Sequence, residues 1–176
     1  MRVLGVDPGS AVTGYGIVEA ERGSFHLVVA GTIRASTLER GPLRLRKIHE
    51  QLLALVDAYS PAVMSLERSF VASNVQSAFR LGEARAVAML VAAERGLEFF
   101  EYAPNEAKLA VAAYGHADKA QVQFMIRKTL GLGDEIAIAH DATDALALAL
   151  CHLSRDRIGR LERIAASIRT PRRSRP

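Results

Sequence analysis

Two carboxylates stand at the ends of short apolar runs, where folding could bring them together. Asp7 ends the run 2–7 and is followed at once by Pro8 and Gly9. Pro8 lacks the backbone N–H that a strand ladder needs, and Gly9 tolerates turn conformations, so we expect Asp7 at the last paired position of a buried strand. A carboxylate there loses water and needs a cation or a donor, unless it only caps the turn that follows.

Glu67 repeats this pattern further along the chain. The spacing of apolar residues over 42–59 predicts a helix, and the apolar run 62–66 that follows it ends in Glu67. A strand, a helix and a second strand form a parallel crossover, which places the carboxyl ends of both strands at the same sheet edge. We therefore expect Glu67 to lie beside Asp7, at the edge where open α/β sheets bind ligands.

Asp141 and Asp144 are three residues apart, so they share one face of the last predicted helix. Leu148 and Cys151 continue that face and are apolar, which indicates that the pair is turned toward the sheet. Two carboxylates held together repel each other and need a cation, although first-turn aspartates can also simply cap a helix. With the two strand-end acids they give four oxygen ligands and no His or Cys cluster, a set suited to Mg²⁺ or Mn²⁺. A pair of such ions could support phosphodiester hydrolysis.

The elements that must position these acids form a single α/β domain. The pattern predicts a mixed five-stranded sheet flanked by helices over residues 1–153, and a flexible, Arg-rich tail over 154–176, with the helical pattern fading beyond Arg155. The other expected elements are strands over 13–19, 25–34 and 97–102, a long helix over 74–95, and shorter helices that begin at Pro104 and after the capping residue Asp118.

The composition fits a cytoplasmic protein that contacts nucleic acid. The chain has 176 residues, of which 49% are hydrophobic, and Cys151 is its one cysteine, so no internal disulfide can form. No apolar run is long enough to span a bilayer. The net charge is +4, but residues 155–176 alone carry eight Arg against two acids, while residues 1–154 are slightly acidic. The basic excess of the tail supports nucleic-acid binding only weakly.

The order and spacing of these motifs resemble the RuvC-type Holliday junction resolvases across residues 1–153. The residues that carry the resemblance are Asp7-Pro8-Gly9-Ser10, Thr13-Gly14-Tyr15-Gly16, Glu67 with Phe70, and Asp141-Ala142-Thr143-Asp144-Ala145-Leu146-Ala147. The resemblance implies a ribonuclease H-like fold, a homodimer, and a crossover junction endodeoxyribonuclease that uses two Mg²⁺ ions per subunit, with Mn²⁺ as a substitute. It further implies paired symmetric nicks in strands of like polarity during recombination and repair, with RuvA and RuvB as partners and no membrane association.

The same resemblance assigns roles to individual residues. Asp7, Glu67, Asp141 and Asp144 would be the metal-binding catalytic acids. Some relatives carry His in place of the first aspartate of the final pair; here Asp141 fills that position, so His140 is interpreted as a bystander.

Five further residues are candidates for DNA contacts. Phe70 could stack on an unpaired base at the junction, or pack under its own loop. Arg68 and Arg80 could contact phosphates or stay solvated. Lys108 and Lys119 are implied as phosphate contacts by the resemblance, whereas their sequence context alone indicates solvated helix charges.

The predicted helix 74–95 is rich in small residues, which allow close packing. Ala78, Gly82, Ala86 and Ala93 recur along it. A dimer seam is the slightly favoured interpretation, and packing against the chain's own sheet is the alternative.

The sequence leaves three alternative functions open. An ATP-binding fold of the actin and sugar-kinase kind also begins with a strand, an Asp and a Gly turn, but needs a second domain. A non-catalytic DNA-binding protein would use these acids as caps. A related nuclease would act on a DNA other than a four-way junction.

Overall fold

The computed structural model describes residues 1–9, 11–35, 41–68, 75–112, 114, 117–133 and 135–169, with side chains as far as residue 162. The elements in chain order are β1 (Arg2–Asp7), β2 (Val12–Glu21), β3 (Ser24–Arg34), α1 (Gly41–Tyr59), β4 (Val63–Glu67), α2 (Val75–Glu94), β5 (Glu98–Tyr102), α3 (Pro104–Ala112), α4 (Lys119–Leu130) and α5 (His140–Arg169).

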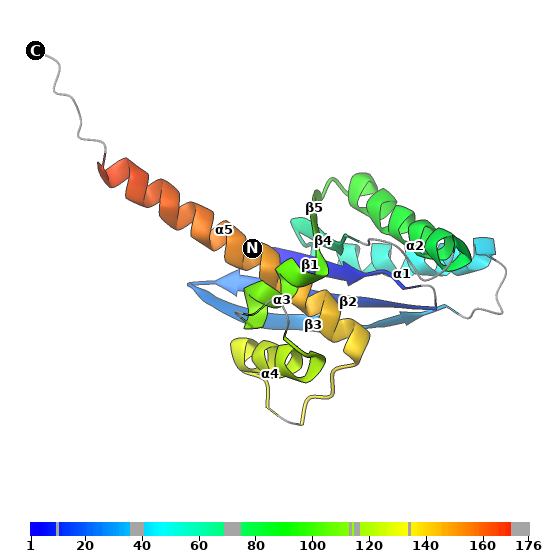
Figure 1. Ribbon diagram of the computed structural model, residues 1–176. Helices are drawn as coiled ribbons and strands as arrows, with labels where there is room; N and C mark the ends of the chain where they lie inside the picture. The colour runs from blue at the N-terminus through cyan, green and yellow to red at the C-terminus, as the bar shows by residue number, and fades with distance from the viewer. Residues whose placement is uncertain are drawn as a thin grey trace, which may run out of the picture.

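The strands form one sheet in the order β3-β2-β1-β4-β5 (Figure 1). β1, β2 and β3 are antiparallel neighbours because short connections join them. β4 is parallel to β1, and β5 to β4, because α1 and α2 return the chain between them. The mixed five-stranded α/β sheet predicted from the sequence is therefore confirmed.

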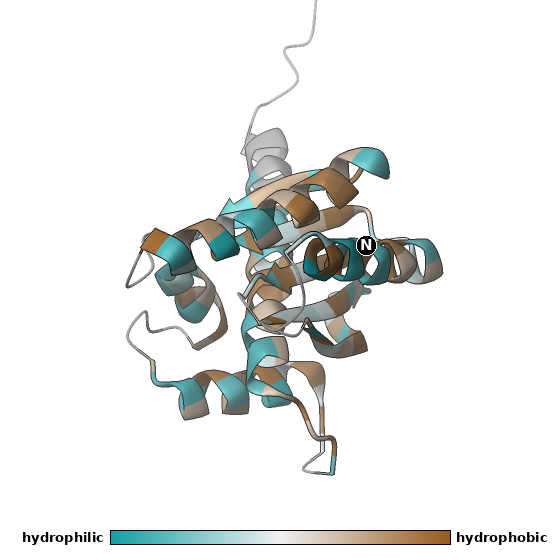
Figure 2. Cartoon of the chain, turned by 90° about the vertical axis from the view of Figure 1, so that its right-hand side faces the viewer, coloured by the Kyte–Doolittle hydropathy of each residue, from teal (hydrophilic) through white to brown (hydrophobic). Residues whose placement is uncertain are grey.

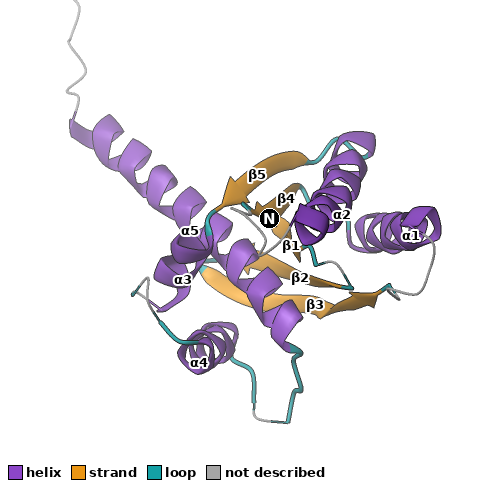
Figure 3. Ribbon diagram, turned by 45° about the vertical axis from the view of Figure 1, so that its right-hand side comes forward, coloured by secondary structure: helices purple, strands orange, loops and turns teal. Residues whose placement is uncertain are grey.

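Helices cover both faces of the sheet, with α1 and α2 on one side and α3, α4 and α5 on the other (Figure 3). Successive side chains of β1 alternate between the two cores, so Leu4 and Val6 pack toward α1 and α2, while Val3 packs toward α5. The same alternation places Asp7 on the α5 face. Figure 2 shows that the helices carry both apolar and polar residues, as helices that flank a sheet do. Among the described residues, no helix is apolar over a bilayer's thickness.

The helix α5 packs directly on the backbone of the sheet. A Cβ atom at Gly5 would lie 1.9 Å from the carbonyl oxygen of Ala145, and one at Gly14 would lie 1.9 Å from that of Asp141. Gly16, which pairs with Gly5 across β1 and β2, also faces α5 and would clash with its side chains. The helix can approach this closely because these three positions have no side chain.

Ser65 fixes the register of α5 on this surface. Its buried hydroxyl donates a hydrogen bond of 2.8 Å to the carbonyl oxygen of Leu148. Ser65 lies beside Gly5 in the parallel pair of β4 and β1, so Gly16, Gly5 and Ser65 form a row across three strands beneath the helix. A hydrogen bond of this kind contributes about 1 kcal/mol net, and an unpaired buried hydroxyl would cost more.

The last helix is longer than the sequence predicts. We expected the helical pattern to fade beyond Arg155, but α5 continues to Arg169, so that expectation is wrong. An ion pair of 2.8 Å between Arg160 and Asp156, one turn apart, supports the extension. The division into a domain over 1–153 and a separate tail stays a prediction.

Gly5→Ala tests the close docking of α5. The new methyl group would meet helix backbone, which cannot yield as a flexible side chain can, so we expect the free energy of unfolding to fall by about 3 kcal/mol or more in urea denaturation. Gly41→Ala is the matched control, because a Cβ there meets nothing within 4 Å. It should change stability by less than about 0.5 kcal/mol, and equal stability of the two variants would contradict the docking.

Candidate active site

The two strand-end acids lie side by side on the face covered by α5. β1 and β4 are parallel, with Val6 opposite Leu66, so the next residue of each strand, Asp7 and Glu67, ends its strand at the same level. The charge of Glu67 raises the pKa of Asp7, so the two carboxyl groups lie within electrostatic reach of each other. The neighbourhood expected from the crossover pattern is therefore present.

The docking of α5 brings the second pair of acids to the same edge. Gly14 pairs with Asp7 across β1 and β2, and the backbone of Asp141 lies directly over Gly14. Asp144 follows one turn later on the same helix face. The first turn is fixed by Thr143, whose hydroxyl donates to the carbonyl oxygen of Ala139 at 3.1 Å. All four acids thus meet at the carboxyl edge of β1 and β4.

The electrostatics confirm that the acids influence one another. The pKa of Asp7 is raised to about 8, first by burial and then by the negative charges of the other three acids. Burial, and next the charge of Asp144, raises the pKa of Glu67. Burial also raises the pKa of Asp144, and Asp141 adds to that effect. This cluster has more negative charge than its surroundings neutralise, which is the environment that a bound cation stabilises.

The donor set fits a hard divalent ion in its chemistry, since it consists of carboxylate oxygens. Within the described ranges, however, no three His, Cys, Asp or Glu side chains are gathered as a group that could already hold a metal ion.

Two lysines influence the acids electrostatically. The charge of Lys119 is the strongest influence that lowers the pKa of Asp144, and Lys108 lowers the pKa values of both Glu67 and Asp144. Lys119 is the first residue of α4, whose N-terminus is fixed by a capping box between Asp118 and Gln121. The structure thus brings both predicted lysines within electrostatic reach of the acids.

Arg85 is a residue that the sequence analysis missed. From α2, on the other face of the sheet, its guanidinium donates to the backbone carbonyl oxygen of Glu67 and to the carboxylate of Glu101. It therefore fixes the end of β4 and lowers the pKa of Glu67. No local sequence pattern could have revealed this contact. An arginine in a helix is interpreted as a solvated charge until the structure shows its partners.

A network behind the acids ties α3 to α5. Arg155 of α5 pairs with Glu106 of α3 at 2.7 Å and lies over the ring of Tyr102, with its Cζ atom 5.1 Å from the ring centroid. Glu106 also caps α3 by accepting from the backbone N–H of Ala103 at 2.7 Å. Because Lys108 is part of α3, this network helps to fix the position of Lys108.

His152 completes this network from inside the core. Its Nδ1 lies 2.8 Å from the hydroxyl oxygen of Tyr102, and both side chains are buried. Burial lowers the pKa of His152 and raises that of Tyr102 to about 12, so the contact is between neutral groups. This contact gives His152 a structural role in the core.

The remaining predicted residues have different surroundings. Arg68 is exposed and donates to the backbone carbonyl oxygen of Glu101 at 3.3 Å. Arg80 is exposed on α2. Phe70 lies outside the described residues. His140, interpreted as a bystander, is close enough for its charge to lower the pKa of Asp144.

Comparisons with known proteins point to one family. The family model described as "Crossover junction endodeoxyribonuclease RuvC" matches residues 3–152. Relatives bearing that description include one from Geobacter sulfurreducens, 47% identical over 86% of this chain and 92% of its own length, and one from Salinibacter ruber, 44% identical over 89% of this chain and 87% of its own length.

Solved structures show the same relationship. A structure titled "T. thermophilus RuvC in complex with Holliday junction substrate" has a TM-score of 0.84 and 31% identity, covering 90% of this chain and 96% of that one. The yeast mitochondrial Holliday junction resolvase Ydc2 has a TM-score of 0.66 at 14% identity over 94% of this chain and 83% of that one, which supports the fold alone.

The raised pKa of Asp7 predicts a pH-dependent stability in metal-free buffer. The folded protein holds the Asp7 proton up to about pH 8, whereas the ordinary value is 3.8. This group therefore contributes a loss of stability that grows as the pH rises from about 4 to about 8. We expect Asp7→Asn to remove that loss and to raise the free energy of unfolding at pH 8 by roughly 2–4 kcal/mol in EDTA.

The exposed substitution Glu21→Gln provides the control and should leave the pH profile unchanged. If the Asp7→Asn variant were no more stable than the unsubstituted protein at pH 8, the carboxylates would not be buried and mutually repelling as described above.

Proposed function

The chain belongs to the RuvC family of crossover junction endodeoxyribonucleases, and we propose that it resolves Holliday junctions through Asp7, Glu67, Asp141 and Asp144. It is a nuclease of the Holliday junction resolvase family with the mixed five-stranded sheet of that fold. The observation that carries the assignment of the site is the convergence of four carboxylates, from two strands and one helix, at one sheet edge.

In this proposal the four acids hold two Mg²⁺ ions per subunit, and Mn²⁺ can replace them. Asp7 is the central ligand, because it ends the middle strand of the sheet and the charges of the other three acids all act on it. Bound divalent ions would supply Lewis acidity and an activated water. Arg85 holds the backbone carrying Glu67 in place from the opposite face of the sheet.

Cleavage would proceed by attack of water on phosphorus. A new phosphorus–oxygen bond forms to the water oxygen, and the bond to the 3′ oxygen breaks, which leaves 5′-phosphate and 3′-hydroxyl ends. The charges of Lys108 and Lys119 both act on Asp144, which supports a role in offsetting the negative charge that develops on the phosphate. Phe70, Arg68 and Arg80 would contact the junction around this centre.

A homodimer would present two such sites to two strands of like polarity, which explains paired symmetric nicks. The seam proposed here is the outer surface of α2, where large apolar side chains stand exposed beside small residues. Those apolar residues are Val75, Phe79, Met89 and Leu90, with exposed fractions of 72%, 69%, 44% and 52%. Gly82, Ala86 and Ala93 lie exposed among them, and isolated monomers rarely leave so continuous an apolar face in water.

The cellular setting follows from the same assignment. The protein would act in the cytoplasm during DNA recombination and repair, together with the RuvA and RuvB branch-migration proteins. Four-way junction DNA is its substrate in this proposal, and plain duplex should be cut far less.

Asp7→Asn separates this proposal from the alternative of a non-catalytic DNA-binding protein. The variant should bind an immobile four-way junction as tightly as the unsubstituted protein in a gel-shift assay. It should lose nicking in Mg²⁺ by about a thousandfold or more, because a carboxylate that organises both ions is missing. Asp57→Asn, at an exposed carboxylate paired with Arg95, is the control and should cut normally. Undiminished nicking by the Asp7 variant would refute the assignment of the acids.

Phe79→Asp tests the proposed seam. A charge placed in an apolar interface should shift the protein from dimer to monomer in analytical ultracentrifugation, with the dissociation constant raised about tenfold or more. Phe124→Asp, on α4 at the other face of the sheet and 63% exposed, makes the same change away from the seam and should leave the mass unchanged. Dimers that persist in the Phe79→Asp variant but not in the Phe124→Asp variant would place the interface elsewhere.

A further inference from the structure

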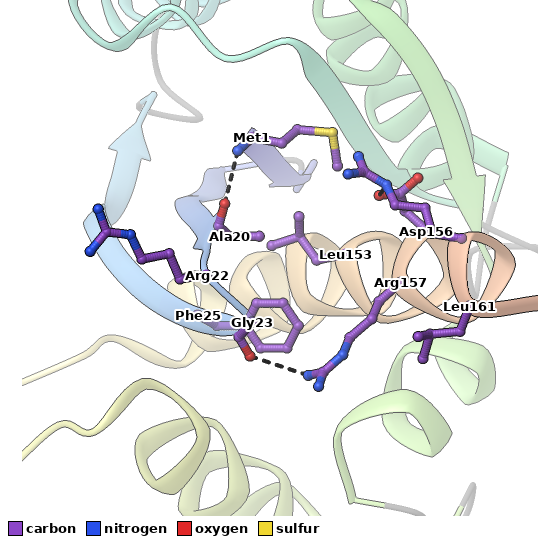
Figure 4. Close-up of a pocket in the computed structure, with 10 residues that line it drawn as sticks. Met1, Ala20, Arg22, Gly23, Phe25, Leu153, Asp156, Arg157 and Leu161 are labelled. Atoms are coloured by element: carbon purple, nitrogen blue, oxygen red, sulfur yellow. Dashed lines mark hydrogen bonds and ion pairs between the residues drawn. The ribbon is translucent and has the colours of Figure 1, made fainter. Parts of the chain in front are cut away.

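A groove lies at the opposite end of the molecule from the acids, and its residues have no part in the proposed cleavage. It has a volume of about 330 Å³ and lies between the turn that joins β2 to β3 and the C-terminal part of α5 (Figure 4). Met1, Phe25, Leu153 and Leu161 line it with apolar side chains. Its volume is at the lower end of the range for ligand sites, which suits one or two large side chains of a partner.

The floor of this groove is incompletely covered. Leu153 is buried, and Phe25 packs partly against the core beneath α5. Leu161 remains 57% exposed at the open end, although it is a large aliphatic residue. The apolar side chains that line this groove remain in contact with water. Binding of a partner's apolar side chain is favourable because it displaces that water.

The rim of the groove is strongly basic. Arg22, Arg157 and Arg160 line it, against the single acid Asp156. Asp156 is already engaged by Arg160 at 2.8 Å, and Arg157 donates to the carbonyl oxygen of Gly23 at 3.2 Å, which holds its guanidinium at the edge of the groove (Figure 4). The side chain of Arg22 is 92% exposed and lies 3.7 Å from the carboxylate of Glu21, which is itself 62% exposed. The lining residues carry three Arg and one acid, and carboxylates of a partner can offset this net positive charge.

The groove can be filled while DNA occupies the acids. α5 advances about 1.5 Å per residue, so Arg157 lies about 20 Å along the helix from Asp144. Figure 1 shows the C-terminal part of α5 running past the sheet at the N-terminal end of β1, whereas Asp7 ends the same strand on the other side.

We propose that this groove binds an acidic segment of a partner protein, with an apolar anchor side chain seated beside Leu161 and Phe25 and carboxylates paired to the arginine rim. DNA is a poor occupant, because an apolar floor offers nothing to phosphates. The chain's own last residues, 170–176, carry three Arg and no acid, so they share the sign of the rim. A second copy would bring an equally basic rim against this one.

An array of synthetic ten-residue peptides tests the proposal with the full chain. Each peptide carries two Leu or Phe anchors among Asp and Glu, and the array covers every spacing between the anchors. We expect at least one peptide to bind in fluorescence anisotropy. Leu161→Ser should weaken that binding by about fivefold or more. Ile158→Ser is the matched control: Ile158 is on the same helix and is 56% exposed, but does not line the groove.

The rim is tested in the same assay. Arg22→Gln should weaken the binding of the peptide and reduce the salt dependence of that binding. Arg46→Gln, at an exposed arginine on α1, should do neither.

A saturating four-way junction should leave the peptide bound. The proposal is overturned if no peptide binds, if Leu161→Ser and Ile158→Ser behave alike, or if junction DNA displaces the peptide. A change of oligomeric mass caused by Leu161→Ser alone would assign the groove to a second copy and also overturn it. None of these readouts requires nuclease activity, so failure here and failure of the proposed function are distinguishable.

Discussion

The direct contact between α5 and the sheet backbone is the constraint on which the candidate site depends. Gly5, Gly14 and Gly16 leave no side chains beneath the helix, and Ser65 fixes its register through the Leu148 carbonyl oxygen. If larger residues lifted α5 away, the aspartates on its first turn would move off the edge where the strand-end acids stand. A packing feature deep in the core therefore determines the spacing of groups that come from distant parts of the chain.

That spacing carries an energetic cost. Buried, mutually repelling carboxylates raise one another's pKa values, and the charges of Lys108, Lys119 and Arg85 offset part of this effect. The remaining negative charge favours divalent ions at this edge. In the proposed function, this loss of stability in the absence of metal is the cost of keeping several carboxylates in a partly buried place.

The sequence predicted the sheet and the meeting of the acids because both follow from local rules. A crossover forces Asp7 and Glu67 to one edge, and a three-residue spacing forces Asp141 and Asp144 to one face. The packing role of the glycines in β2 was not predicted, since it depends on a helix more than 100 residues away. Arg85 and the pairing of Arg155 with Glu106 were missed for the same reason. The helical extension beyond Arg155 was missed because its apolar periodicity is weak, while one-turn ion pairing supports it.

Titration of Mn²⁺, followed by electron paramagnetic resonance, tests the central claim most directly. If one shared site joins the acids of β1 and α5, Asp7→Asn and Asp144→Asn should each weaken the same bound ions. The double variant should then bind them little worse than the more affected single variant. Independent losses that add in the double variant, or Mn²⁺ binding unchanged by either substitution, would contradict a common centre.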